Sequence, residues 1–261
     1  MKSPKPVKCF ENTEFLHSPQ ARTIRILSEY LEPRSRLAKY NVRDTIAFFG
    51  SARLCDGETA QARVASAVSD EEKAAAQKCL AGSRYYEEAR ALAARLTVWA
   101  KGVSDKEDRY VICSGGGPGI MEGANRGAYE AGGRSIGLNI SLPMEQVPNP
   151  YITPELCFDF HYFFMRKLWF AYLAKALVVF PGGFGTLDEL METLTLAQTK
   201  KFRKQMLVVL YGTDYWHKVI NFDAMEELGT ISSEDRSLFR NANTPDEAFD
   251  ILTPWLKETY G

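Results

Sequence analysis

Residues 176–197 read ALVVFPGGFGTLDELMETLTLA, and this stretch decides the fold. Its first five residues are an apolar run too short for a helix, and the sequence PGG ends that run. Thr186 and Glu189 then stand three apart, just before apolar residues that recur at helical spacing. The stretch therefore predicts a short buried strand, a tight glycine turn and the start of a helix.

A helix that starts at a glycine turn can bind an anion. Its first backbone N–H groups lack partners within the helix and carry the positive end of the dipole, and glycines let an anion approach them closely. The residue types fit a phosphate site, beside which the Glu189 carboxylate can align a water or stabilise a cationic sugar. Thr186 and Glu189 also match a capping box, which stabilises a helix start without a ligand. Both interpretations stay open at this point.

Composition indicates a globular protein with one α/β domain. The chain has 261 residues, 45% of them hydrophobic, and its formal net charge of −1 favours a small-molecule partner over nucleic acid or an anionic membrane. Five scattered cysteines without a CxxC pair predict neither a disulfide framework nor a zinc site. The first ten residues lack an apolar segment after their lysines, and no stretch approaches the roughly 18 apolar residues of a membrane span. We expect a cytoplasmic protein.

Strands and helices alternate along the rest of the chain. This alternation predicts a doubly wound α/β fold, a parallel sheet with helices on both faces, in residues 45–261. Residues 1–44 are expected to be an N-terminal extension, and the alanine-rich, charged residues 54–83 an insertion. The expected strands are residues 45–49, 110–113, 135–140, 156–160, 176–180, 206–211 and 238–241. The expected helices include residues 18–37 broken at Pro33, 84–100, 214–228, and 245–257 capped by Thr244.

Glycine turns follow three of the predicted strands, at Gly50, Gly115 and Gly182. Because ligands of doubly wound sheets bind beyond the carboxyl ends of the strands, we expect these turns to converge on one crevice. The proline-rich loop of residues 142–154 is expected to cross the surface near these ends.

Residues 161–174, HYFFMRKLWFAYLA, predict a helix that is largely buried, in the core or in a subunit interface. Arg166 and Lys167 are the charges in its middle, and cations are costly to bury without a partner. An anionic ligand is one such partner. His161 has no second His or Cys near it in sequence and is interpreted as structural.

Two common nucleotide-binding patterns are absent. The dinucleotide fingerprint GxGxxG is not completed from Gly115 or Gly117, and the next predicted strand offers no acid for a ribose hydroxyl, which disfavours NAD. No glycine is followed by the Lys-Ser/Thr pair of a P-loop in this context, so ATP hydrolysis is not supported.

The motifs SGGGPGIMEGA at residues 114–124, MRK at 165–167 and PGGFGTLDE at 181–189 together resemble the LOG (LONELY GUY) phosphoribohydrolases, which are often mislabelled as lysine decarboxylases. The similarity runs from about residue 45 to 211. It implies a Rossmann-like sheet, a homodimer or higher homo-oligomer, and cleavage of the N-glycosidic bond of a nucleoside 5′-monophosphate such as AMP or a cytokinin riboside 5′-monophosphate. The products would be the free base and ribose 5-phosphate, and no metal or redox cofactor is implied.

The resemblance also implies roles for individual residues. Arg166 and Glu189 match the catalytic pair, in which the carboxylate would stabilise an oxocarbenium-like sugar and activate water. The matched substrate-binding positions are Ser51, Gly115, Gly116, Gly117, Met121, Lys167, Gly182, Gly183, Gly185, Thr186 and Glu192. Glu192 would contact the ribose, although its spacing also fits a solvated helix face.

Two other functions fit the same pattern. One is a non-catalytic nucleotide-binding or molybdenum-cofactor carrier protein on the same kind of sheet. The other is a pyridoxal-phosphate lysine decarboxylase, which requires a lysine placed for a Schiff base, and the sequence singles out none. The residues outside the compact family pattern, 1–40 and 54–83, leave substrate identity and oligomer architecture open.

Overall fold

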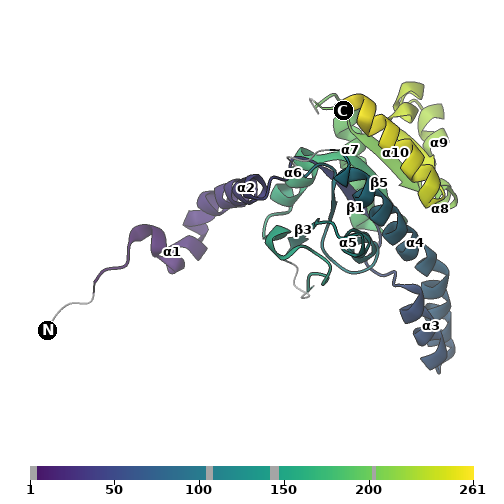
Figure 1. Ribbon diagram of the computed structural model, residues 1–261, viewed down its shortest axis with the longest axis horizontal. Helices are drawn as coiled ribbons and strands as arrows, with labels where there is room; N and C mark the ends of the chain where they lie inside the picture. Colours follow the sequence, from purple (N-terminus) through teal and green to yellow (C-terminus); the bar gives the residue numbers. More distant parts are fainter. Residues whose placement is uncertain (1–4, 104–107, 142–146, 202–203) are drawn as a thin grey trace.

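In the computed structural model, which describes residues 5–103, 108–141, 147–201 and 204–261, seven parallel strands form one sheet in the order β4-β3-β2-β1-β5-β6-β7. The predicted doubly wound, Rossmann-like class is confirmed (Figure 1). The strands are β1 (Thr45–Phe49), β2 (Val111–Ser114), β3 (Ser135–Ile140), β4 (Cys157–Phe160), β5 (Ala174–Val179), β6 (Leu207–Tyr211) and β7 (Phe239–Ala242).

Helices bury both faces of this sheet, because its strands are apolar on both sides. One core contains residues of α4, α5 and α10, and the other contains residues of α2, α6, α7, α8 and α9. Short 3-10 turns join several of them: η1 (Cys9–Glu11), η2 (Pro19–Ala21), η3 (Pro154–Leu156) and η4 (Ser233–Leu238). The α-helices are α1 (Thr13–His17), α2 (Arg22–Lys39), α3 (Gly57–Ser66), α4 (Asp70–Lys101), α5 (Ile120–Glu130), α6 (Phe163–Leu173), α7 (Phe184–Gln198), α8 (Thr213–Val219), α9 (Phe222–Glu227) and α10 (Pro245–Tyr260).

The strand order reverses at the centre of the sheet. From β1 the chain winds outward through β2, β3 and β4 on one side, and it then returns to β5 on the other side of β1. The connections that leave the carboxyl ends of β1 and β5 therefore run to opposite faces and leave a crevice between them. Two of the predicted glycine turns lie at this point.

Three predicted helices have other bounds in the structure. Helix α2 continues through Pro33 instead of breaking there: Pro33 is buried, and Ile26, Tyr30 and Leu37 hold the helix against the core on both sides of it. Helix α4 is a single helix of 32 residues that starts at a Ser69–Glu72 capping box inside the predicted insertion. The helix expected at 214–228 is divided into α8 and α9, because the Asn221 side chain accepts the backbone N–H of Ala224 and starts a new helix.

The closing helix agrees with its prediction, since Thr244 caps α10 by accepting the backbone N–H of Glu247. The predicted loop of residues 142–154 lies partly outside the described residues. Within the described part of the chain, no helix is long and apolar enough to cross a membrane. The cytoplasmic location remains a prediction.

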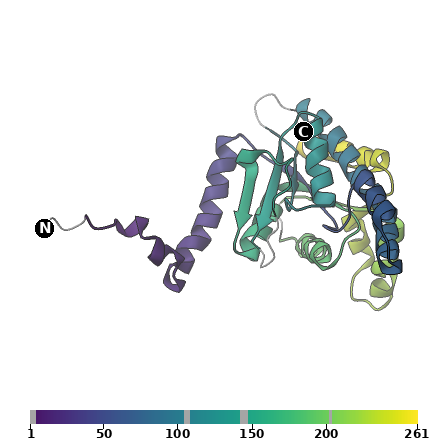
Figure 2. The same ribbon diagram turned by 90° about the horizontal axis from the view of Figure 1, so that it is seen from below.

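The N-terminal segment extends away from the sheet. Residues 5–21, which we call the N-terminal arm, include η1, α1 and η2 and project beyond α2 into solvent (Figures 1 and 2). The hairpin of α3 and the first half of α4 projects from the body in another direction (Figure 1). The arm lies within the predicted N-terminal extension, and this hairpin contains most of the predicted insertion.

Helix α6 is less buried than the sequence predicts. The prediction that residues 161–174 are largely buried is only half correct, because Phe163, Phe164, Leu168 and Tyr172 are between 39% and 63% exposed.

Candidate functional site

The ends of β1 and β5 form a glycine-lined turn. Pro181 accepts a hydrogen bond from the backbone N–H of Ser51 at 3.0 Å, and Phe180 donates one to Phe49 at 2.8 Å. At Gly182, a Cβ atom would overlap the Thr186 hydroxyl and lie 3.0 Å from the Ser51 nitrogen. Only glycine fits this position, so close approach of the two turns depends on it.

The turn after β2 meets the same point. The backbone N–H of Ile120, at the start of α5, donates to the Ser51 carbonyl at 3.1 Å. Gly119 has a φ of +72°, which side chains disfavour, and a Cβ atom at this position would also overlap the Ser51 carbonyl. Both the backbone conformation and the close contact therefore require glycine. The three glycine turns converge, as the sequence predicts.

Helix α7 begins earlier than the sequence suggests. Gly183 is its N-cap residue, without a side-chain cap, and Thr186 lies within the first turn. The Thr186–Glu189 capping box is therefore wrong as an interpretation of the motif. No atom lies within 4 Å of a Cβ built on Gly183 or Gly185, so the first turn of α7 faces open space. Uncapped first-turn N–H groups beside open space are suited to bind an anion.

Arg166 reaches this region from α6. Its Nε donates to the Leu138 carbonyl in β3 at 2.7 Å, and its guanidinium carbon lies 5.3 Å from the centre of the Phe170 ring. One guanidinium nitrogen lies 2.5 Å from where a Cβ on Gly115 would stand, and the Met121 sulfur lies 2.8 Å from that same point. The structure thus brings Arg166, Met121 and the Gly115 turn together.

Glu189 is the buried acid of the site. It lies on α7, one turn after Thr186, and is only 7% exposed. Burial raises the pKa of its carboxyl to about 7, and the positive charges of Lys167 and Arg166 oppose that rise. Burial lowers the pKa of Arg166, and the negative charge of Glu189 opposes that shift. The two catalytic candidates therefore lie close enough to interact electrostatically.

Lys167 holds two acids beside this pair. Its ammonium group contacts Asp188 at 2.7 Å and Glu192 at 2.6 Å, and with Glu189 it lines a narrow crevice between α6 and α7. Burial alone would lower the pKa of Lys167, but the hydrogen bonds that its ammonium group donates to Asp188 and Glu192 raise it. Glu192 is thus engaged in an ion pair with Lys167 on a partly exposed part of α7. Its predicted contact with ribose remains untested.

Comparisons of the sequence with known proteins assign the chain to a family. A family sequence model described as "possible lysine decarboxylase" matches residues 121–252, just over half of the chain. A probable cytokinin riboside 5′-monophosphate phosphoribohydrolase of Oryza sativa is 30% identical over 56% of this chain and 69% of its own length. The chain belongs to the LOG family. A cytokinin riboside 5′-monophosphate phosphoribohydrolase of Arabidopsis thaliana is 30% identical over 52% of this chain and 63% of its own length.

Solved structures share the fold of this LOG protein at lower sequence identity. The molybdenum cofactor binding protein of Rippkaea orientalis has a TM-score of 0.50 at 14% identity and covers 82% of this chain and 98% of its own. The Moco carrier protein of Chlamydomonas reinhardtii has a TM-score of 0.50 at 16% identity and covers 83% and 99%. These likenesses concern the fold alone.

An asparagine network, which the sequence did not reveal, supports the Gly115–Gly117 turn of this LOG protein. The Asn149 side chain donates to the carbonyls of Gly116 and Gly117 at 3.1 and 3.0 Å and to the Asn125 side chain at 3.0 Å. Ser114 donates to Asn125 at 2.6 Å. A loop asparagine has no periodicity that could identify it; the only sequence signal is its position in the Asn-Pro turn after β3.

We expect Asn149→Ala to destabilise this LOG protein by roughly 1–3 kcal/mol, because the buried Gly117 carbonyl and the Asn125 side chain would lose a donor, whereas Gly116 keeps the backbone N–H of residue 149. Denaturant unfolding measures this loss. Gln61→Ala, on the exposed surface of α3, is the matched control and should change stability by less than about 0.5 kcal/mol. Equal effects of the two variants would contradict a supporting role for Asn149.

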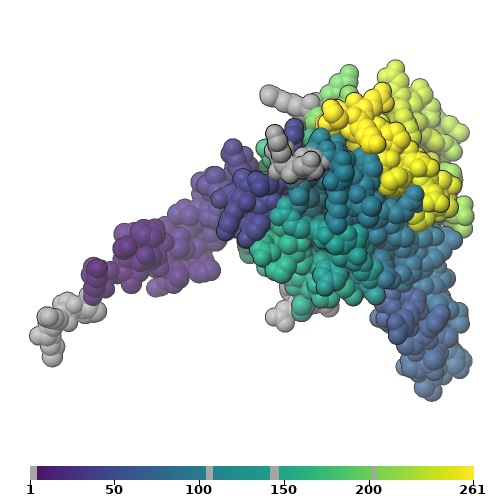
Figure 3. Space-filling view, in the orientation of Figure 1, coloured from purple at the N-terminus to yellow at the C-terminus, as the bar shows by residue number. Residues whose placement is uncertain are grey.

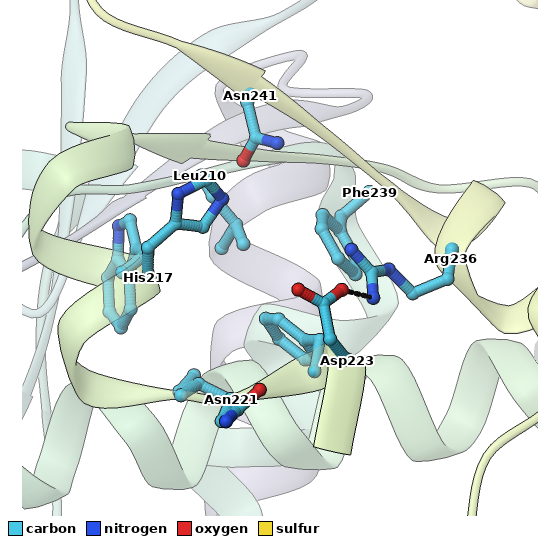
Figure 4. A pocket seen from close by; sticks show the side chains of 10 residues that line it. Leu210, His217, Asn221, Asp223, Arg236, Phe239 and Asn241 are labelled. Atoms are coloured by element: carbon cyan, nitrogen blue, oxygen red, sulfur yellow. Dashed lines mark hydrogen bonds and ion pairs between the residues drawn. The ribbon is translucent and has the colours of Figure 1, made fainter. Parts of the chain in front are cut away.

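A second unpredicted contact comes from α8. The Tyr215 hydroxyl donates to the Gly182 carbonyl at 2.8 Å, and the Trp216 indole donates to the carbonyl of Val179, at the end of β5, at 3.1 Å. Beyond Trp216 lies a separate cavity of about 210 Å³, between α8, α9 and β7 (Figure 4). None of the predicted site residues lines it.

Proposed function

We propose that this chain hydrolyses the N-glycosidic bond of a purine nucleoside 5′-monophosphate, either AMP or a cytokinin riboside 5′-monophosphate, to the free base and ribose 5-phosphate. The observation that carries the proposal is a buried Glu189 with a pKa near 7, next to Arg166 and one turn from a glycine-lined, uncapped helix start. The names of the relatives in Oryza and Arabidopsis support this substrate class.

Each part of the site has a step in the proposed reaction. The phosphate would bind the first-turn N–H groups of α7 and the Ser51 turn, which fixes the ribose relative to Glu189. As the bond between C1′ and the base nitrogen breaks, the Glu189 carboxylate would stabilise the cationic sugar and accept a proton from the attacking water. Arg166 would orient the nucleotide and stabilise the electron pair that the departing base nitrogen receives. The base nitrogen would take one proton from solvent, and Glu189 would return to solvent the proton that it accepted from the water, so no net proton is gained or lost.

Incubation with AMP and with isopentenyladenosine monophosphate, followed by chromatography, tests the proposal. We expect release of free base and an equal amount of ribose 5-phosphate from at least one of them. Adenosine, which lacks the phosphate, should react far more slowly because it cannot use the anion site. Absence of release from both nucleotides at high enzyme concentration contradicts the proposal. If the nucleotides then raise the melting temperature without turnover, the chain is a non-catalytic binding protein.

The reaction should depend on the protonation of Glu189. Burial raises its pKa to about 7, so the ionised form that can accept a proton becomes dominant only above that pH. We expect kcat/KM to increase with pH through about 7 and then to level off. A kcat/KM that is constant between pH 5 and 9 would exclude Glu189 as the base.

A decarboxylase with pyridoxal phosphate does not fit the residues of the site. Such an enzyme forms a Schiff base through a lysine whose amine can lose its proton. Lys167, which lies beside Glu189, instead contacts both Asp188 and Glu192, and these contacts raise its pKa. An absorbance band of pyridoxal in the purified protein would overturn this conclusion.

A further inference from the structure

Two cysteines meet beside the hairpin of α3 and α4, which projects from the body of the molecule (Figure 3). Cys55 is buried in the loop between β1 and α3, and Cys79 is half-buried in the first half of α4. Both thiols are free, and both belong to the predicted insertion. The proposed hydrolase reaction uses neither of them, so their place in the fold calls for another explanation.

The loop that carries Cys55 packs along α4 next to Cys79. The side chain of Leu54 fills the space over Gly82, where a Cβ atom would stand 2.5 Å from one of the Leu54 methyl groups. Gly82 lies one turn after Cys79, on the same side of the helix. The residue that follows Leu54 is therefore held against this part of α4, and a hydrogen bond joins the Cys55 and Cys79 thiols.

Helix α3 supplies a cation to the Cys79 sulfur. The Arg63 guanidinium donates to it, with 3.6 Å between Nη1 and Sγ. A cation at this position stabilises a thiolate, which is the form of cysteine that attacks a disulfide. It also disfavours a metal cation at the same sulfur, and within the described ranges no three His, Cys, Asp or Glu side chains gather that could hold one. The surroundings of Cys79 therefore favour thiol chemistry.

Cys55 is held in its protonated form. Burial raises the pKa of its thiol to about 12, and the hydrogen bond and the charge of Cys79 add to this rise. Because the thiolate is the nucleophile, Cys55 stays unreactive while Cys79 is a free thiol. Modification of the Cys79 sulfur would remove the contribution of Cys79 to the pKa and place an electrophilic sulfur beside Cys55.

We propose that Cys79 and Cys55 form a thiol-modification site that reacts with a small-molecule disulfide of the oxidised glutathione type. The Cys79 thiolate would attack one sulfur of the small molecule, whose S–S bond breaks and releases one small thiolate. Cys55 would then lose its proton and attack the Cys79 sulfur of the mixed disulfide, which releases the second small thiolate. The two small thiolates take up two protons, equal to those that the cysteines lost. The pair is oxidised to one disulfide, and the small disulfide is reduced to two thiols.

The new bond would tie the loop after β1 to α4. The same loop carries Ser51, whose backbone N–H donates to the Pro181 carbonyl and whose own carbonyl accepts the backbone N–H of Ile120. A cross-link four residues beyond Ser51 limits the opening of this loop, so amide exchange in residues 51–57 should slow by roughly tenfold or more on oxidation. Exchange that oxidation of the pair leaves unchanged would contradict this effect. The measurement does not depend on hydrolase activity.

Incubation of the full chain with oxidised glutathione tests the proposal directly. Acid quenching, alkylation of the remaining thiols and peptide mass spectrometry then locate each modification. We expect a peptide in which Cys55 is linked to Cys79, and dithiothreitol should restore both thiols. The exposed Cys9 should react as an isolated thiol and shows that the oxidant is active. A chain in which glutathione modifies Cys9 while Cys55 and Cys79 remain unlinked overturns the proposal.

Two variants separate the roles of the two sulfurs. Cys55→Ser should accumulate a mixed disulfide between glutathione and Cys79, because the second step is blocked. Cys79→Ser should leave Cys55 as a free thiol, because that thiol is buried. Circular dichroism shows whether each variant keeps the fold, and the result with the unaltered chain decides the proposal without them. Rapid modification of Cys55 in folded Cys79→Ser would overturn the proposed order of attack.

Arg63→Gln should slow the first step by roughly tenfold, because the cation that stabilises the Cys79 thiolate would be lost. Lys73→Gln is the matched control, since it removes the same charge from an exposed position of α4. It should leave the rate of Cys79 modification unchanged. Equal rates in the two variants would overturn the assignment of Cys79 as a thiol activated by Arg63.

Discussion

Replacement of Glu189 by Gln is expected to abolish base release and, at the same time, to stabilise the folded protein at pH 8. Gln cannot accept the proton of the attacking water or carry the negative charge that stabilises the sugar cation, so we expect kcat to fall by about 10²–10⁴-fold. The stability gain follows from burial, which raises the pKa of Glu189 from 4.5 to about 7. Between these pH values the folded chain holds a proton that the unfolded chain has lost.

Stability therefore decreases as pH rises from about 4.5 to about 7, and the loss stays constant above that range. Since one unit of pKa shift corresponds to about 1.36 kcal/mol, the loss of folding free energy amounts to roughly 3 kcal/mol. The Gln variant avoids this loss because the Gln side chain is neutral at every pH. Denaturant unfolding at pH 5 and pH 8 measures the difference between the variant and the unaltered protein. We expect the stability difference to be larger at pH 8.

Glu234→Gln, at an exposed position of η4, is the control and should change neither activity nor its pH dependence. Full activity of Glu189→Gln would remove Glu189 from the reaction. A variant that is inactive and also less stable at both pH values would show that the carboxylate has a structural role instead. The combination of lost activity and increased stability is the result that only a buried catalytic acid explains.

The sequence predicts the parts of this site that depend on local order in the chain. A strand, a glycine turn and a helix start are all contained within residues 176–197, and the turns at Gly50, Gly115 and Gly182 must meet because parallel strands bring their carboxyl ends to one edge. The capping-box interpretation of Thr-x-x-Glu places the start of α7 too late in the sequence. The backbone of the structure shows that Gly183 is the N-cap residue.

The features that the sequence predicts wrongly or does not reveal depend on tertiary contacts. Proline disfavours the interior of an isolated helix, but α2 continues through Pro33 because Tyr30 and Leu37, on either side of it, pack against the core. The ion pair between Lys167 and Glu192 requires α6 and α7 to lie side by side, which no spacing in the sequence reveals. Asn149 supports a turn more than thirty residues away in the chain, and irregular loops carry no period that would indicate such a contact.

Replacement of Arg166 by Met is expected to reduce kcat/KM by about 10²–10³-fold, because a fixed cation that orients the nucleotide and favours departure of the base would be lost. The change should also move the pH profile. The positive charge of Arg166 lowers the pKa of Glu189, so its removal raises that pKa, and the rise of kcat/KM should shift to a pH above 7.

Lys167→Met separates the loss of a cation that orients the nucleotide from the change in the pKa of Glu189. The charge of Lys167 also lowers the pKa of Glu189, and its contribution is larger than that of Arg166, so this variant should shift the pH profile in the same direction. Lys167 is held by Asp188 and Glu192, however, whereas Arg166 lies at the Gly115 turn. At a pH where Glu189 is fully ionised, Lys167→Met should recover most of the activity and Arg166→Met should not. Equal recovery of both variants would mean that Arg166 acts only through the charge it places near Glu189.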